Sequence, residues 1–384
     1  MRFGSILPIN IFNIVFLKFP FAAMTLRSFA VITLVKMMAV CGLLRRGPRC
    51  EIRSLTSRAV SPPSWASASI SPPSFSDAFQ LARDYLLANA VPEAESSARY
   101  LLCDVVKAGY RLSDFTRAAQ RNPPVVLTPN QLQTLSAHCE QRARRKPVQY
   151  ILGNWDFCGM EFECLAPVLI PRPETEELVE RILGSGSLSA GSAILDVGAG
   201  TGAIGVSLLA HLQRLEQTAG GSARASCLAL DVDPAAASLA MRNAATLLPR
   251  PAAYTCLAQS LSLYVSSGSG RGNFDIVVSN PPYIPSREMA ELEPEVVGWE
   301  SRLALDGGTD GLDVVRELLA GAGQLLRPEG PRELWLEVSR SHPDEIEALV
   351  GQELPRPRWR VQEKAKDLSG HPRFVRLRSL EPLS

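Results

Sequence analysis

A strand-like segment, a glycine-rich loop and an apolar helix-like segment follow one another between residues 193 and 215, and they constrain the fold most strongly. Residues 193–197 are apolar apart from one acid, as in a strand that is covered on both faces. The loop that follows carries glycines at alternate positions, where the backbone can approach a ligand closely. The next helix offers unpaired N–H groups at the same point. The succession predicts an open α/β sheet with a ligand site at the carboxyl ends of its strands.

The next predicted strand, residues 227–230, ends in Asp231. An acid in this place can accept hydrogen bonds from ribose hydroxyls, which indicates a cofactor that contains a nucleoside. The glycine loop also satisfies the permissive dinucleotide fingerprint, so these residues alone leave both NAD and S-adenosylmethionine open. Asp196, directly before the loop, favours S-adenosylmethionine, because its carboxylate would repel a pyrophosphate and attract the ammonium group of methionine.

Residues 276–278 are β-branched and predict a further buried strand, which ends at the sequence Asn280-Pro281-Pro282-Tyr283. The prolines cannot extend the strand, because each lacks a backbone donor and has a fixed φ. The loop therefore brings an amide, a free backbone carbonyl and a phenol to the edge of the sheet where ligands bind. These groups fit a flat target that bears an amide or amine. They have no role in hydride transfer, which again favours S-adenosylmethionine.

Residues 1–60 contain one acid, Glu51, against nine lysines and arginines. A basic, acid-poor and Ser-containing segment is typical of an organellar transit peptide, and residues 61–74 resemble a Ser/Pro-rich linker. We therefore predict that residues 1–74 form a transit peptide and a disordered linker. A membrane span is disfavoured, because the longest uncharged run, residues 3–17, is shorter than the roughly 18–20 residues required. A secretory signal is disfavoured by basic residues that recur far beyond a short n-region.

Residues 75–146 have a helical pattern and predict a small substrate-recognition domain. Pro92 is expected in the first turn of one helix, and Thr128 and Pro129 are expected as the N-cap and first residue of another. The last helix ends in a basic run of Arg142, Arg144, Arg145 and Lys146. This run either complements the helix C-terminus or contacts an acidic or RNA-bound partner.

Residues 147–172 predict a β-hairpin linker, and residues 173–384 a catalytic domain. In the linker we expect short strands and a turn at Gly159. In the catalytic domain we expect a short acidic helix, a longer helix, two further strands and a terminal hairpin that contains one antiparallel strand. The expected linker strands are residues 149–153, 155–157, 161–163 and 168–170. The later elements are helices at 289–297 and 312–326 and strands at 334–338 and 374–377.

Metal and nucleic-acid chemistry find little support in the composition. The eight cysteines include no pair at C-x-x-C spacing, the four histidines are isolated, and no metal site is predicted. The formal net charge of +1 does not indicate a broad basic surface for nucleic acid.

Together these motifs resemble the class I S-adenosylmethionine-dependent methyltransferases, and more narrowly the HemK/PrmC family of protein-(glutamine-N5) methyltransferases. The resemblance covers nearly all of the chain after the leader. It rests on residues 147–153, 169–176, 196–202, 280–283, 304–312 and 366–370. It implies a Rossmann-like, mostly parallel seven-stranded sheet with a small N-terminal helical domain and a β-hairpin linker.

The resemblance also implies the reaction and the site. The family methylates the glutamine of a Gly-Gly-Gln loop in peptide chain release factors, which supports translation termination. Asn280, Pro281 and Tyr283 would be catalytic and, with Pro282, would bind the substrate glutamine. The residues expected to bind S-adenosyl-L-methionine are Asp196, Gly198, Ala199, Gly200, Thr201, Gly202, Asp231 and Asn280.

Two positions depart from the family pattern. Gln259 and Ser260 follow the third strand, where the family often has an acid, and Ser301 replaces a proline between Glu300 and Arg302. The resemblance and the leader together predict a monomeric mitochondrial matrix protein that acts on release factors, without a membrane or a stable nucleic-acid partner. A plastid location and a start at Met24 or Met37 remain open.

The alternative enzyme is a nucleic-acid adenine-N6 or guanine-N2 methyltransferase, because such enzymes share the Asn-Pro-Pro-Tyr motif. A catalytically inactive assembly factor is a third reading, disfavoured by the intact motifs. Because no general base accompanies the motif, we expect catalysis by positioning. Two acceptors would hold the amide N–H bonds so that the nitrogen lone pair points at the sulfonium methyl group.

Overall fold

The computed structural model describes residues 61, 63, 65, 72–219, 224–352 and 358–380, all within one compact unit, Ser57–Ser384. The predicted transit peptide, residues 1–60, lies outside the described residues, as does most of the predicted linker. In the part of the chain that is described, no helix is both long enough and apolar enough to cross a membrane.

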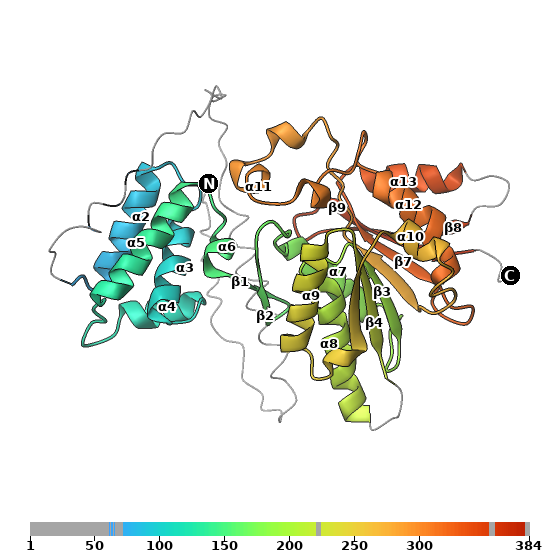
Figure 1. The fold of residues 1–384 in the computed structure, drawn as a ribbon, viewed down its shortest axis with the longest axis horizontal. Coiled ribbons are helices and arrows are strands. Elements are labelled where there is room, and N and C mark those ends of the chain that lie inside the picture. The colour runs from blue at the N-terminus through green and yellow to red at the C-terminus, as the bar shows by residue number, and fades with distance from the viewer. Residues whose placement is uncertain are drawn as a thin grey trace, which may run out of the picture. The chain divides into compact units, whose positions relative to one another are not determined.

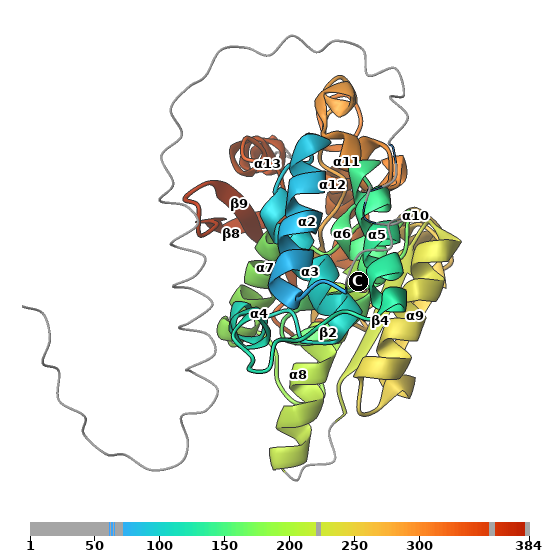
Figure 2. The ribbon, with the colours of Figure 1, turned by 90° about the vertical axis from the view of Figure 1, so that its left-hand side faces the viewer.

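Within residues 72–146, four helices share one hydrophobic cluster, which includes Phe75, Leu101 and Leu135. Helices α2, α3 and α5 lie side by side (Figure 2). Thr128 caps α5 and Pro129 is its first residue, as predicted; the Gln131 side chain completes a capping box. The helices are α2 (Phe75–Ala88), α3 (Ala94–Val106), α4 (Leu112–Ala119) and α5 (Pro129–Ala143).

The next segment contains a short helix and one hairpin, which corrects two of the four predicted strands. Of residues 149–153, the first four belong to a helix, which Pro147 precedes and Gly153 ends in a left-handed conformation with φ +79°. Residues 168–170 belong to no strand, and the apolar Val168 and Ile170 are buried without a pairing partner. The elements are α6 (Val148–Leu152), β1 (Asn154–Phe157) and β2 (Met160–Glu163).

Seven strands form one sheet in the order β5-β4-β3-β6-β7-β9-β8 (Figure 1). The first five strands are parallel, and β9 is antiparallel to both of its neighbours. This arrangement confirms the predicted mostly parallel seven-stranded sheet and its terminal hairpin. The strands are β3 (Ala193–Val197), β4 (Ser226–Asp231), β5 (Tyr254–Ala258), β6 (Ile276–Ser279), β7 (Glu333–Glu337), β8 (Trp359–Lys366) and β9 (Pro372–Ser379).

Helices cover both faces of the sheet, as the apolar strands require. One hydrophobic cluster contains Ile194 and Val278 with helices α7, α8 and α9, and a second contains Leu195 and Val277 with α10, α12 and α13. The helices are α7 (Pro173–Gly184), α8 (Ala203–Ala219), α9 (Pro234–Leu247), α10 (Leu261–Ser266), α12 (Asp313–Gly321) and α13 (His342–Gly351).

Two predicted helices are shorter than expected. The acidic helix at 289–297 is split, because Pro294 cannot continue a helix and instead begins a new one. The helix predicted to end at residue 326 becomes a 3₁₀ helix after Gly321. The short elements are η2 (Pro251–Ala253), η3 (Met289–Glu291), α11 (Pro294–Val297), η4 (Arg302–Ala304) and η5 (Ala322–Leu325).

The order of the strands reverses between β3 and β6, which are direct neighbours although they are far apart in the chain. Val197 at the end of β3 pairs with Ser279 at the end of β6. The glycine loop and the Asn280 loop therefore leave the sheet side by side, at the topological switch point where ligands bind in open α/β sheets.

Candidate active site at the carboxyl edge of the sheet

The glycine loop after β3 has a left-handed backbone at its alternate glycines. Gly198, Gly200 and Gly202 have φ of +80°, +55° and +82°, values that residues with a side chain rarely adopt. The N–H groups of Gly198 and Ala199 both donate to the carbonyl of Leu230, which fixes the loop to the end of β4. A Cβ on Gly200 would meet no atom within 4 Å, so the loop faces open space at this point.

Thr201 supports the glycine loop from behind. Thr201 is 3% exposed, and its carbonyl accepts a hydrogen bond of 2.9 Å from Nδ2 of Asn243 on α9. The loop is therefore held from two sides, by β4 and by α9, before any ligand binds.

Asp231 lies at the end of β4, half-buried beside the glycine loop. Its carboxylate accepts the N–H of Gly200 at 2.8 Å and the N–H of Asp233 at 2.9 Å. Burial raises its pKa, and these two hydrogen bonds only partly offset the rise. A carboxylate has about four lone-pair positions, so Asp231 keeps acceptor capacity for ribose hydroxyls.

Asp196 is fully buried beneath the glycine loop. One carboxylate oxygen accepts the N–H of Gly205 at 3.0 Å, and the other has no partner among the described residues. Burial raises the pKa of Asp196 to about 7. A buried carboxylate oxygen without a partner fits a cationic group nearby, since a positive charge would favour the ionised form. The glycine loop, Asp231 and Asp196 thus offer the chemistry that a nucleoside with an ammonium-bearing side chain requires.

The second loop of the site begins at Asn280, directly after β6. Nδ2 of Asn280 donates a hydrogen bond of 3.1 Å to Oγ1 of Thr175 on α7. A Cβ built on Gly198 would lie 3.8 Å from the backbone carbonyl oxygen of Asn280, so the two loops border the same space. The predicted cofactor and acceptor residues therefore come together at one place.

A segment far along the chain packs against the backbone of this second loop. A Cβ on Gly307 would lie 2.6 Å from the carbonyl oxygen of Pro282, and a Cβ on Gly311 would collide with the carbonyl oxygen of Tyr283. Backbone hydrogen bonds also join the two segments. The N–H of Ile284 donates to the carbonyl of Leu305, and the N–H of Gly307 donates to the carbonyl of Ile284. The glycines after residue 306 are needed because the two backbones approach so closely.

Tyr283 is half-buried next to a cationic side chain. Its hydroxyl is 3.5 Å from Nη1 of Arg373, and the guanidinium lies 5.9 Å from the centre of its ring. Burial and the nearby Glu337 raise the pKa of Tyr283, although Arg373 acts in the opposite direction. Tyr283 is therefore a neutral phenol at physiological pH.

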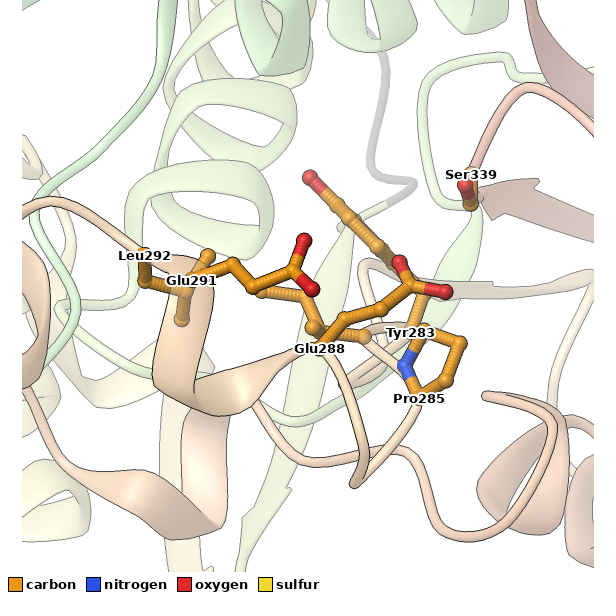
Figure 3. A pocket seen from close by; sticks show the side chains of 7 residues that line it. Tyr283, Pro285, Glu288, Glu291, Leu292 and Ser339 are labelled. Carbon is orange, nitrogen blue, oxygen red and sulfur yellow. The ribbon is translucent and has the colours of Figure 1, made fainter. Parts of the chain in front are cut away.

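A cavity of about 210 Å³ lies beside Tyr283 (Figure 3). It has apolar walls and two carboxylates, and it extends from the Asn280 loop towards the segment after β7. Its lining residues are Tyr283, Ile284, Pro285, Glu288, Glu291, Leu292 and Ser339.

Two charged clusters lie near the site. Arg172, the residue before α7, hydrogen-bonds both carboxylate oxygens of Glu300 at 2.7 Å. In the basic run, Arg142 and Arg145 bind Glu295 of α11 at 3.0 and 2.8 Å, so both are engaged within the chain. These two arginines therefore have an acidic partner within the chain, which neither reading of the basic run named.

Sequence reasoning missed Thr175 and Glu337 as parts of the site. Thr175 lies within the motif at residues 169–176, and Glu337 within the strand predicted at residues 334–338, but neither was predicted to have a role. The one available signal was an acid at the carboxyl end of a buried parallel strand, the same position that drew attention to Asp231. Within the described residues, no group of His, Cys, Asp and Glu could hold a metal ion.

Comparison with known proteins gives a consistent result. The model of the PrmC N-terminal domain matches residues 77–153. The MTRF1L release factor glutamine methyltransferase of Homo sapiens is 36% identical over 299 residues, which cover 76% of this chain and 83% of the relative. The release factor glutamine methyltransferase of Caulobacter vibrioides is 34% identical, covering 78% of this chain and 94% of the relative.

Solved structures were compared as well. The crystal structure of the release-factor-specific protein-(glutamine-N5) methyltransferase from Alicyclobacillus acidocaldarius matches with 26% sequence identity and a TM-score of 0.32. The match covers 57% of this chain and 99% of that chain.

Proposed function

The chain belongs to the release factor glutamine methyltransferase family, and we propose that it methylates the glutamine of the Gly-Gly-Gln loop in a peptide chain release factor. The methyl group of S-adenosyl-L-methionine goes to the side-chain amide nitrogen, N5. S-adenosylhomocysteine leaves, and the methylated nitrogen releases one N–H proton to solvent. The observation that carries the proposal is the adjacency of the glycine loop after β3 and the Asn280 loop after β6. This adjacency allows a methyl donor and a planar amide to meet at one edge of the sheet.

The glycine loop and two acids hold the cofactor in this proposal. Bound S-adenosylmethionine supplies an electrophilic methyl group on a sulfonium. Asp231 accepts hydrogen bonds from the ribose hydroxyls, and the free oxygen of Asp196 favours the methionine ammonium. The backbone of the glycine loop would bind the rest, and the open space beside Gly200 leaves room for it; the loop residues are Gly198, Ala199, Gly200, Thr201 and Gly202.

Asn280, Pro281, Pro282 and Tyr283 hold the substrate glutamine. A carboxamide nitrogen is a poor nucleophile, because its lone pair is delocalised into the carbonyl. The side-chain oxygen of Asn280 and the carbonyl of Pro281 accept its two N–H bonds, which turns the lone pair towards the methyl donor. Orientation of this kind can lower a barrier by at most about 7–11 kcal/mol. The same acceptors stabilise the positive charge that develops on nitrogen.

Tyr283 and Pro282 complete this grip as flat, uncharged surfaces. Because burial keeps the phenol of Tyr283 protonated, its ring packs on the glutamine amide without adding a charge. The cavity beside Tyr283 then receives a residue next to the glutamine.

We also propose the setting in which the enzyme works. Residues 75–146 recognise the release factor, residues 147–172 link them to the catalytic part, residues 173–384, and the enzyme acts as a monomer. The basic, acid-poor residues 1–60 direct it to the mitochondrial matrix. Expression of residues 1–74 fused to a fluorescent protein tests the location, and a plastid or cytosolic signal rejects it.

Labelled S-adenosylmethionine and an organellar release factor test the reaction itself. The release factor should acquire one label, and a Gln→Ala variant of its Gly-Gly-Gln loop should acquire none. Label that persists in the Ala variant rejects glutamine as the target. Label that enters DNA or RNA in place of the release factor supports a nucleic-acid methyltransferase.

A further inference from the structure

Asn280 can act as an acceptor only if its side-chain amide is turned the right way. The two ends of an asparagine amide have nearly the same shape, but one end accepts hydrogen bonds and the other donates them. If the amide were reversed, its NH2 group would face the NH2 group of the substrate glutamine. A group behind Asn280 must therefore fix the orientation of its amide.

Thr175 lies behind Asn280 and receives its N–H. Oγ1 of Thr175 is 3.1 Å from Nδ2 of Asn280, and the threonine is 4% exposed. Its backbone N–H donates to the carbonyl of Arg172 at 3.0 Å, at the start of α7. The hydroxyl is thus placed by a rigid helix end and is shielded from water.

A hydroxyl alone cannot choose the orientation of an amide, because it can both donate and accept. Glu337 at the end of β7 removes this ambiguity. Its buried carboxyl group, 1% exposed, lies next to the side chain of Thr175 and can accept the hydroxyl proton. An ionised carboxylate can only accept, so the single hydroxyl proton of Thr175 points to Glu337. The lone pairs of Oγ1 are then left for the N–H of Asn280.

We infer that Glu337 and Thr175 are positioning residues that fix the acceptor orientation of the Asn280 amide. The three side chains of Glu337, Thr175 and Asn280 lie in a row behind the Asn280 loop, which we call the acceptor loop. They come from the end of β7, the start of α7 and the residue after β6. Glu337 contacts neither substrate nor cofactor in this account and acts only through its neighbours. The inference rests on the proposed function, because it explains how Asn280 recognises an amide NH2 group.

The charge of Glu337 should then matter. Burial raises its pKa to about 7, although the hydrogen bond from Thr175 and the charge of Arg373 lower it. The other charged groups that act on it are Glu174 and Arg172 near the start of α7, and the phenol of Tyr283 lies across from it. A protonated Glu337 can donate to Thr175, whose hydroxyl can then donate to Asn280 and reverse its amide. Turnover should therefore rise as the pH increases through about 7.

The test compares Thr175→Val, which removes the hydroxyl at constant shape, with Thr175→Ser, which keeps it. Release-factor methylation by Thr175→Val should have a kcat lower by roughly 10- to 100-fold, as expected for a lost hydrogen bond that orients a charged transition state. Thr175→Ser should stay near the wild type, and S-adenosylmethionine affinity, measured by calorimetry, should stay within about twofold in both. Thr246→Val, which removes a hydroxyl bonded within α9, is the matched control.

A pH series with Glu337→Gln completes the test. At saturating S-adenosylmethionine, the wild type should gain kcat between pH 6 and pH 8. The Gln variant should show a smaller rise, because residue 337 can no longer ionise while Asp196 titrates in the same range in both proteins. Thr175→Val with unchanged kcat, or a Gln variant with the wild-type pH profile, would overturn the inference. If the wild-type enzyme does not methylate the release factor, the proposed function is rejected. If the wild type is active and the variants behave like it, only the positioning role of Thr175 and Glu337 is rejected, so the two failures are distinguishable.

Discussion

Two buried glutamates in this protein have opposite electrostatic surroundings. Glu295 on α11 is 9% exposed and accepts hydrogen bonds from Arg142 and Arg145 of the N-terminal helical region. Burial alone would raise its pKa, but the hydrogen bonds from Arg145 and Arg142 together hold it below the ordinary value. Glu295 is therefore charged at every physiological pH and joins two parts of the fold.

Glu337, beneath the acceptor loop, has no such partner. Within residues 72–219, 224–352 and 358–380, no lysine or arginine forms an ion pair with it, and one of its oxygens has no hydrogen-bond partner. Its pKa lies near 7 because burial dominates. The contrast indicates that the chain neutralises a buried acid where it serves stability and leaves one close to titration where it serves chemistry.

The largest expected effect is on the residue that Glu337 supports. Asn280→Ala should lower kcat by roughly 100- to 1000-fold, because it removes an acceptor that stabilises developing charge. Calorimetry should show S-adenosylmethionine affinity close to that of the wild type. Near-normal turnover of Asn280→Ala would contradict the positioning role of Glu337, because that role acts only through Asn280.

The next effect concerns the other glutamate. Glu295→Ala leaves Arg142, which is 6% exposed, without its counter-charge and should lower the free energy of unfolding by roughly 3 kcal/mol. Urea unfolding measures this loss, and Glu291→Ala in the neighbouring η3, where the side chain is exposed, serves as control. Equal free energies of unfolding for the two variants would contradict a stabilising role of Glu295.

A smaller effect should appear in the pH dependence of stability. The pKa of Glu337 is higher in the folded than in the unfolded chain, so the folded state binds more protons and stability falls as pH rises through about 7. The free energy of unfolding of Glu337→Gln, relative to that of the wild type, should therefore increase by on the order of 2 kcal/mol when the pH is raised from 5.5 to 8. Asp196 titrates in the same range in both proteins, so its contribution cancels. A constant difference across this range contradicts the prediction.

The smallest effect concerns Asp231, a third acid near the same edge of the sheet. Asp231→Asn loses a charged acceptor for the N–H groups of Gly200 and Asp233 and, in the proposed cofactor site, for the ribose, and should weaken S-adenosylmethionine binding roughly tenfold. The release-factor KM should change little, because Asp231 is at β4, away from the acceptor loop. An unchanged cofactor affinity would separate Asp231 from the cofactor site.

Local sequence signals predicted the parts of the fold that local physics determines. The glycine loop, the proline stop after β6, and the cap at Thr128 each follow from a conformational need of the backbone. The paired strands β1 and β2 were predicted for the same reason, since Gly159 permits their turn. Residues 149–153 were misread because a short apolar run fits either a strand or a helix until its neighbours are known.

The positioning residues could not be read from local patterns. Thr175, Asn280 and Glu337 are separated by more than 50 positions in the chain, and only the strand order brings them together. Arg142 illustrates the same limit, since its partner Glu295 follows it by 153 positions. The sequence shows that a residue such as Arg142 is charged. Only the fold shows whether its ion-pair partner belongs to the same chain or to another molecule.

The tight packing of Gly307 and Gly311 against the carbonyls of Pro282 and Tyr283 bears on protein engineering. If a different loop replaced residues 280–283 to change the substrate, residues 307–311 would still pack against it in their original conformation. Any loop with a new course would meet the backbone of residues 307–311 and would be forced back or displaced. The exchangeable unit is therefore a pair of segments, and a library that varies both together should yield folded variants more often than one that varies the loop alone.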